Sequence, residues 1–269
     1  MHVAALARRF PHHSRYSGYW QIVGRQEDVE LLGGRWPRGV PECLTDALIR
    51  RTGRPAYTPT SISLELAGAL RILSRPGALC HVLYGEDDYH YLSVAAPLVQ
   101  RAGGKLVASF HQPPAIFDEA VPSACAERLL LRLDAALVTT SEQARHLSRW
   151  IPTERIHRVP HGVDTGFFTP GTESRVASAT RSVITVGTWQ RDFELLEQVV
   201  REFADRGDPT RFVVVGTPEV ARRFARLPNA ETHTGISDDA LRHLYRRSDA
   251  LFLPPVSYTH LTLPTTPYV

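Results

Sequence analysis

The sequence predicts an α/β protein built from two doubly wound, parallel-sheet domains, of which the second is incomplete. The first observation is an alternation of short apolar runs, typical of buried strands, with segments whose apolar residues recur at helical spacing. The second is a junction at residues 159–170, where a short strand, a turn and two phenylalanines lead into a polar run. The alternation continues on both sides of this junction, as expected for parallel sheets covered by helices.

Length and composition fit this class. A chain of 269 residues can hold one large or two ordinary domains, and a hydrophobic share of 43% is normal for a globular core. No apolar run approaches the roughly 18 to 20 residues that span a bilayer. Residues 1–10 are too short and too quickly basic for a signal peptide, so we expect a cytoplasmic protein.

Charge and cysteine usage argue against nucleic-acid, zinc and disulfide chemistry. The net charge of +3 is mild, and the arginines are interleaved with acids instead of forming a basic stripe. The cysteines Cys43, Cys80 and Cys125 are too widely separated for a zinc site or a disulfide framework. We expect all three to be buried as small apolar residues.

The first half begins as a strand, a glycine-containing loop and a helix. Residues 1–7 form the strand, and Ser17-Gly18 opens the helical pattern. Free N–H groups at such a helix start can face a ligand, so we place Ser17 and Gly18 at a binding cleft. The adjacent His12 and His13 are interpreted as solvated loop residues and not as metal ligands.

A predicted helix, a strand and an acidic turn come next. Residues 63–73 carry leucines at helical spacing and are interpreted as an amphipathic helix of the core, in preference to a membrane anchor. Residues 80–84 form a buried strand that ends in Glu86-Asp87-Asp88. We favour a solvated loop for these acids over the alternative, a site for a metal or a substrate hydroxyl.

His111 is the most informative residue of this half. It directly follows the strand predicted for residues 105–110 and is locked by two prolines shortly after it. Ligands of an open parallel sheet bind at the carboxyl ends of its strands, which makes His111 the candidate catalytic residue. The alternative is a histidine that only caps its loop. Strands at 134–138 and 156–159, separated by a helix, complete the domain.

The second half opens with a strand at 182–186, a turn and a helix. Gly187 allows a ligand to approach the backbone closely, and the start of the helix can face a phosphate. Arg191 adds a positive charge whose fork of donors suits phosphate oxygens. The alternative for Arg191 is a surface ion pair with Asp192 or Glu194.

Two stretches resemble a known family. Residues 159–170, VPHGVDTGFFTP, closely resemble the interdomain segment of family 4 glycosyltransferases, with its glycine, aspartate, aromatic residue and proline at the family's spacing. Residues 235–254, GISDDALRHLYRRSDALFLP, resemble a second segment of the same family, with Ser237 or Asp238 as a helix cap. The resemblance implies a GT-B fold, in which two Rossmann-like domains face each other across a cleft that holds a nucleotide sugar.

The resemblance also implies roles for particular residues. In the family, the strand that matches residues 105–110 commonly ends in a histidine near the donor sugar, which is the role implied for His111. The implied donor-binding candidates are Gly162, Asp164, Gly187, Arg191 and Gly235. Ser17 and Gly18 would lie on the acceptor side of the cleft, which the resemblance gives to the N-terminal domain. The chain departs from the family at Thr188, where an arginine is usual, and no lysine-glycine pair follows.

The implied reaction moves a sugar from a nucleotide-diphosphate donor to an acceptor hydroxyl, with retention and without a cofactor or essential metal. The expected partners are the nucleotide sugar and a glycan, lipid or small-molecule acceptor, with peripheral contact to the inner membrane face left open. One alternative is a nucleotide-sugar epimerase of the same fold, with Glu86 and Asp87 as its acid and base. Another is a non-catalytic module that binds nucleotide sugars.

We expect an N-terminal domain at 1–165, a linker at 166–181, a partial donor domain at 182–255 and a tail at 256–269. Residues 256–266 match one reading frame of a transposon-end sequencing adaptor, so we expect the natural sequence to end near Pro255. The alternative is a real tail rich in threonine and proline. The two donor-gripping glutamates that the family carries after this point are not present. The fragment is therefore expected to be inactive.

Overall fold

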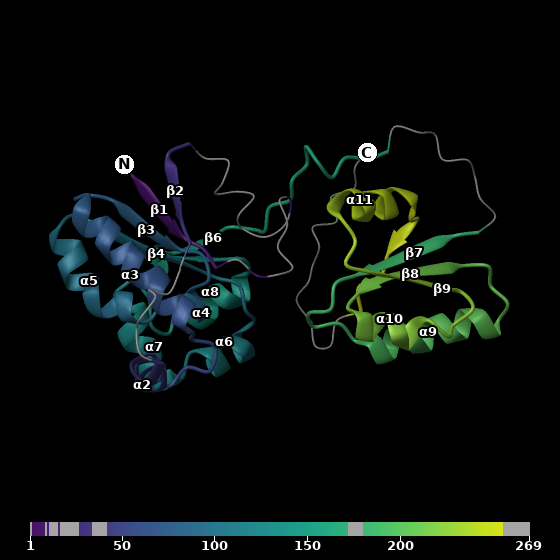
Figure 1. Cartoon of the computed structure of the whole chain (residues 1–269), viewed down its shortest axis with the longest axis horizontal. Helices are drawn as coiled ribbons and strands as arrows, with labels where there is room; N and C mark the ends of the chain where they lie inside the picture. Colours follow the sequence, from purple (N-terminus) through teal and green to yellow (C-terminus); the bar gives the residue numbers. More distant parts are fainter. Residues whose placement is uncertain are drawn as a thin grey trace. The chain divides into compact units, whose positions relative to one another are not determined.

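The computed structural model divides the chain into two units, Met1–Asp164 and Thr165–Val269 (Figure 1). Ser17, Gly18, His12 and His13 lie outside the described residues, as does the predicted tail. The described residues are 2–8, 10, 16, 27–33, 42–171 and 180–254. Within these ranges, no helix is long and apolar enough to cross a membrane.

Unit 1 contains a six-stranded, fully parallel sheet with the order β2-β1-β3-β4-β5-β6. Its strands are β1 (Val3–Leu6), β2 (Val29–Leu32), β3 (Leu79–Val82), β4 (Lys105–Phe110), β5 (Ala135–Val138) and β6 (Ile156–Arg158). Because the strands are parallel, their carboxyl ends meet at one edge of the sheet, and the residues that follow β3, β4 and β5 lie near one another.

Most helices of unit 1 lie in the connections that cross over between successive parallel strands of this sheet. They are α2 (Glu42–Thr52), α3 (Pro59–Ser74), α4 (Gly85–Asp88), α5 (Tyr91–Arg101), α6 (Pro114–Ala120), α7 (Ser123–Leu130) and α8 (Ser141–Leu147), with a 3₁₀ turn at Thr153–Arg155. From β2 onward every connection crosses the sheet in the same direction. Right-handed crossovers therefore place α3, α5, α7 and α8 on one face, and Figure 1 shows α3, α5 and α7 grouped on the same side.

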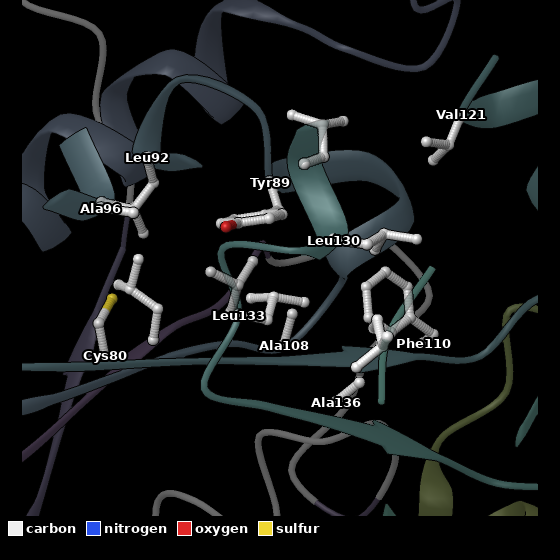
Figure 2. Close-up of a cluster of buried hydrophobic side chains, with 14 of the residues drawn as sticks. Cys80, Tyr89, Leu92, Ala96, Ala108, Phe110, Val121, Leu130, Leu133 and Ala136 are labelled. Carbon is white, nitrogen blue, oxygen red and sulfur yellow. The ribbon is translucent and has the colours of Figure 1, made fainter. Parts of the chain in front are cut away.

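The main core of unit 1 lies between this sheet and these helices. Figure 2 shows Cys80, Ala108 and Ala136 of the strands beneath Leu92 and Leu130 of the helices. All five side chains are nearly or fully buried. Small residues on the strands let large helical side chains approach the sheet closely, which is how a helical layer packs at high density.

Unit 2 contains a four-stranded parallel sheet with the order β10-β7-β8-β9. Its strands are β7 (Ser182–Val186), β8 (Arg211–Gly216), β9 (Ala230–Thr234) and β10 (Ala250–Leu251), and its helices are α9 (Phe193–Asp205), α10 (Pro218–Phe224) and α11 (Asp238–Arg247). Leu196, Val200 and Phe224 pack on one face of the sheet, while Leu241 and Leu244 pack on the other. Helices on both faces make this unit doubly wound.

The predicted fold class is confirmed, because both units are α/β with parallel sheets. The acidic turn was predicted wrongly. Glu86 and Asp88 do not form a solvated loop but lie in the short helix α4, and both are fully buried. Helix α4 comes shortly after β3, and the carboxyl groups of Glu86 and Asp88 are buried there instead of facing solvent.

Two further predictions about burial were wrong. Cys43 is exposed on α2, whereas Cys80 and Cys125 are buried as expected. The helix predicted at 63–73 exists as the longer α3, but its leucines do not all face the core. Leu64 is fully buried, while the other three leucines of the helix, Leu66, Leu70 and Leu73, are about half exposed or more.

Candidate functional site

His111 lies directly after β4, where the sheet of unit 1 ends, and its backbone is held on both sides. The backbone N–H groups of His111 and Gln112 donate to the same oxygen, Glu86 Oε1, at 2.9 and 3.1 Å. Gln143 Nε2, from the first turn of α8, donates to the carbonyl of Gln112 at 3.0 Å. The loop after β4 is thus tied to the loops after β3 and β5.

Glu86 can reach this loop because α4 packs tightly under it. A Cβ at Gly85 would lie 2.7 Å from Phe110 Cε1, so only glycine fits at the start of this turn. Glu86 itself is 0% exposed, and no described group bonds its second oxygen, Oε2. Burial raises the pKa of Glu86 to about 8, and the bonds from His111 and Gln112 oppose that rise. The carboxyl is therefore mostly protonated at neutral pH, with the proton on Oε2.

The imidazole of His111 is fixed in one tautomer. Its Nε2 lies 2.6 Å from the carbonyl oxygen of Leu83, and because a carbonyl only accepts, Nε2 carries the hydrogen. Burial lowers the pKa of His111 to about 4, against the bond to Leu83, which favours the charged ring. The ring is neutral at physiological pH, and its Nδ1 is the acceptor nitrogen.

The part of the junction that belongs to unit 1, residues 159–164, contains His161, which lies beside His111. The ring of His161 is 5.8 Å from that of His111, measured between centroids, and the ring of Tyr84 is 5.5 Å away on an edge-on approach. Asp164 is buried, whereas Gly162 is exposed and does not adopt the left-handed backbone conformation. Two predicted donor-binding residues, Gly162 and Asp164, therefore lie in the stretch whose His161 contacts His111. The backbone conformation at Gly162 does not itself require a glycine.

The buried guanidinium of Arg54 hydrogen-bonds to the backbone of α4. Arg54 is 3% exposed and donates to three carbonyl oxygens, those of Glu86, Tyr89 and Ala120. The bonds to Glu86 and Tyr89 satisfy carbonyls of α4 and its C-cap, and the bond to Ala120 satisfies a carbonyl at the end of α6. Burial lowers the pKa of Arg54, yet a guanidinium stays protonated in proteins.

A second buried carboxyl fixes the start of α5. Glu65 accepts hydrogen bonds from the backbone N–H groups of His90, Tyr91 and Leu92 and from the hydroxyl of Tyr57. Burial raises the pKa of Glu65 to about 7, and these bonds limit the rise. The segment between β3 and α5 is thus held by buried polar groups that the sequence analysis did not select. A signal was present for Glu65, since it is the one acid in a helical stretch whose other charged residue is Arg71.

In unit 2, two glycines open the carboxyl edge of the sheet. Gly187 follows β7 with φ of +85°, and Gly235 follows β9 with φ of +59°. A Cβ built on either glycine would meet nothing within 4 Å, so both turns are open to solvent and to a ligand. The N–H of Gly187 already donates to the carbonyl of Val215 at 3.0 Å. Gly187 therefore contributes space and turn geometry, not a donor.

Arg191 lies at the same edge and is half-buried. In the described part of the chain its Nε has no hydrogen-bond partner although the atom is buried, and the same holds for Oε1 of the adjacent Gln190. No ion pair with Asp192 or Glu194 is found there either, so the surface-pair alternative is not observed. Burial raises the pKa of Tyr245, and the nearby charge of Arg191 opposes that rise.

The helix start that was predicted to face a phosphate already has a partner. Asp192 is the N-cap of α9, and its carboxylate accepts from the N–H of Leu195 at 2.8 Å. A carboxylate at this position satisfies one free N–H and reduces the attraction of the helix terminus for another anion. In unit 2, the cation beside the open glycine turn is therefore the better anion contact.

The structure brings the predicted residues together in two groups. His111 lies beside His161, in the junction that holds Gly162 and Asp164 in unit 1, and Arg191 follows Gly187 by four residues in the connection between β7 and α9 of unit 2. Gly235 is at the same sheet edge as Gly187, with β8 between the two strands that precede them. Across the described ranges, no group of three His, Cys, Asp or Glu residues could hold a metal ion.

Neither protein-family models nor curated protein sequences show a match to this chain. Among solved structures, the chain is similar to the catalytic domain of starch synthase IV from Arabidopsis thaliana, bound to ADP and acarbose. The TM-score is 0.51 at 10% sequence identity, over 74% of this chain and 56% of that chain. The chain has a GT-B-type fold of Rossmann-like domains.

Other solved structures are less similar to the chain, with lower TM-scores. A putative UDP-N-acetylglucosamine 2-epimerase from Listeria monocytogenes gives a TM-score of 0.48 at 11% identity, over 87% of this chain and 62% of that chain. The lipopolysaccharide outer core galactosyltransferase WaaB gives 0.46 at 9% identity, over 73% and 55%. This GT-B chain spans less than two thirds of the length of each of these three structures.

Proposed function

We propose that the protein is a family 4-like glycosyltransferase, which transfers a sugar from a nucleotide-diphosphate donor to an acceptor hydroxyl with retention and without a metal. The observation that carries the proposal is Arg191, a half-buried guanidinium with an unpartnered Nε beside the open Gly187 turn. It lies at the sheet edge where ligands of doubly wound domains bind. The GT-B-type fold and the resemblance of residues 159–170 and 235–254 support the same assignment.

Arg191 is assigned to the donor diphosphate. When the sugar–phosphate bond breaks, negative charge builds on the departing diphosphate, and a fixed cation stabilises it without a proton transfer. A guanidinium that is already partly desolvated interacts more strongly with phosphate than one in water does. Gly187 leaves the space for a phosphate to approach, and Gly235 leaves similar space after β9.

His111 is assigned to the donor sugar as a hydrogen-bonding residue. Because Nε2 donates to the carbonyl of Leu83, any contact of the neutral ring with a sugar hydroxyl would be made as an acceptor. A pKa of about 4 leaves very little imidazolium at neutral pH, which does not suit a general acid. Asp164 and Gly162 of the adjoining junction are assigned to the same donor, while Ser17 and Gly18 stay predictions for the acceptor side.

The epimerase alternative receives less support from the geometry of unit 1. Glu86, its candidate acid or base, is fully buried and holds the backbone of the His111 loop. A substrate would have to displace this loop to contact the carboxyl. We therefore do not propose a second catalytic function, and the non-catalytic binding module is tested together with the leading proposal.

Calorimetric titration with UDP, GDP and ADP tests the assignment of Arg191. We expect Arg191→Ala to weaken binding of the preferred nucleotide about tenfold or more, since a charged hydrogen bond of this kind contributes about 1.5–3 kcal/mol. Arg206→Ala is the matched control, because Arg206 is exposed at the end of α9 and pairs with Glu202. Equal losses in the two variants would refute the assignment.

Activity is tested by release of UDP or GDP from nucleotide sugars. A second polypeptide, in which the residues after Pro255 are those that the source gene encodes there, is assayed beside the given chain. If either polypeptide releases UDP or GDP from a nucleotide sugar, and replacement of His111 or Arg191 by alanine lowers that rate, the result supports the transferase. Tight binding by both with no turnover of any nucleotide sugar would favour the non-catalytic module instead.

A further inference from the structure

The connection between β7 and α9, residues 187–192, presents an indole to solvent. Trp189 is 64% exposed, although every other residue of the connection is polar or glycine. The indole therefore contributes little to the core of unit 2, and its exposure is unfavourable because it leaves a large apolar surface in water. A flat apolar side chain that is kept exposed in a polar connection is typical of a ligand contact.

The exposure of Trp189 does not come from a loosely held connection. At one end, the N–H of Gly187 donates to the carbonyl of Val215 at 3.0 Å, and at the other the N–H of Asp192 donates to the carbonyl of Pro254 at 2.8 Å. The backbone is thus fixed on both sides of the indole. Little conformational entropy would be lost when a ligand binds a side chain that is presented in this way.

Gln190, next to the indole, adopts an unfavourable conformation. Its φ is +51°, the one positive φ at a residue other than glycine in the described part of the chain. Residues that keep such a backbone conformation cluster at functional sites. Its amide oxygen Oε1 is buried and has no hydrogen-bond partner among the described residues. A buried acceptor without a donor is also unfavourable, and a ligand hydroxyl would supply the donor once the side chain turns toward the indole.

These groups fit a sugar ring better than a lipid chain or a nucleobase. One face of a sugar ring carries C–H groups, whose slightly positive hydrogens are attracted to the negative face of an indole. Its rim carries hydroxyls that donate to an amide oxygen such as that of Gln190, which a lipid chain would leave without a donor. A nucleobase is separated from its diphosphate by the ribose. The Cα atoms of Trp189 and Arg191, the proposed diphosphate contact, are two residues apart and so at most about 7 Å from each other.

We propose that Trp189 and Gln190 form an acceptor subsite that binds a saccharide, which makes the acceptor a glycan. The subsite rests on the proposed function, and retention explains its position. The bond from the acceptor oxygen to the anomeric carbon forms on the face of the donor sugar where the bond to the diphosphate breaks, and the acceptor proton passes to the released diphosphate. The acceptor ring therefore lies close to the diphosphate contact, and Trp189 is two residues from Arg191.

Ligand-detected NMR with the full chain tests the subsite. The probes are the methyl glycosides of glucose, galactose, mannose and N-acetylglucosamine, each with and without UDP or GDP. We expect saturation transfer to at least one glycoside, and binding about tenfold weaker in Trp189→Ala because the stacking face is lost. Leu251→Ala is the matched control, since it shortens an exposed apolar side chain of β10, and it should bind as the wild type does.

Gln190→Gly separates a ligand contact from a structural role. Glycine adopts the left-handed conformation without strain, so this variant should raise the urea midpoint of unit 2 while it weakens glycoside binding about fivefold. A higher midpoint with unchanged glycoside binding would refute the role of Gln190.

The same titrations distinguish the subsite from the proposed function. If a nucleotide binds but no glycoside does, or if Trp189→Ala weakens nucleotide binding as much as glycoside binding, the subsite is refuted and the proposed function stands. Glycoside binding that requires Trp189, without binding of any nucleotide, would refute the transferase and leave a saccharide site.

Discussion

Replacement of Glu86 by glutamine should make unit 1 less sensitive to rising pH. The glutamine side chain would keep a carbonyl-type acceptor for the N–H groups of His111 and Gln112, and its amide would occupy the place of the protonated Oε2. The perturbation therefore removes the ionisation and preserves the shape and the clamp. It is a test of one property, the proton on a buried carboxyl.

The magnitude follows from the pKa of Glu86. Burial raises this pKa from 4.5 to about 8, so between these values the folded chain holds a proton that the unfolded chain has lost. Stability must then fall as pH rises, by up to about 1.4 kcal/mol per pH unit. Between about pH 5 and pH 7 the wild type should lose about 2–3 kcal/mol relative to Glu86→Gln, and the difference should level off above about pH 8.

Urea unfolding at several pH values measures this difference. Trp189 is exposed in unit 2, so a Trp189→Phe background leaves tryptophan fluorescence to unit 1. Glu127→Gln, on the exposed surface of α7, is the control that should run parallel to the wild type. Parallel curves for Glu86→Gln and the wild type would refute the argument, since they would mean that Glu86 loses its proton equally easily in both states.

Two further predictions concern the same sheet edge. Gly85→Ala should destabilise unit 1 by about 1–3 kcal/mol, because the new methyl group would lie 2.7 Å from the Phe110 ring. Gly33→Ala is the control, since a methyl group there would meet nothing within 4 Å, and an unchanged urea midpoint for Gly85→Ala would contradict the prediction. The ring protons of His111 should show no titration in NMR spectra between about pH 6 and pH 8, because burial lowers its pKa to about 4, and an inflection near the ordinary value of 6.5 would contradict the buried, neutral ring.

The order of elements could be predicted because it rests on local patterns. Apolar runs such as 105–110 and 182–186 are short, uninterrupted and followed by turn residues, and the structure has β4 and β7 at these positions. The strand β9 and the helix α10 were missed. All five residues of β9 are polar or small, and α10 is only seven residues long, so neither presents enough periodic signal.

Burial of polar groups could not be predicted from the same patterns. Glu86-Asp87-Asp88 has the composition of a solvated loop, and only the tertiary structure places Arg54 and Arg8 where they offset the burial of these acids. The leucines of α3 show the converse. Helical spacing identifies a helix, but a stripe wide enough to include both Leu64 and Leu70 covers two faces, and periodicity does not state which one meets the sheet.

Burial determines which of the candidate residues are charged at neutral pH. Glu86 is protonated and His111 is neutral, both because unit 1 excludes water from them. Among the described candidate site residues, Arg191 is the one cation, and its buried Nε is unpartnered. Under the proposed function, affinity for the nucleotide diphosphate should therefore fall as salt rises, whereas the added affinity from the sugar should not. Salt series with UDP and with UDP-glucose measure the two contributions, and a sugar contribution that fell with salt as steeply as UDP binding would remove His111 from its assigned role.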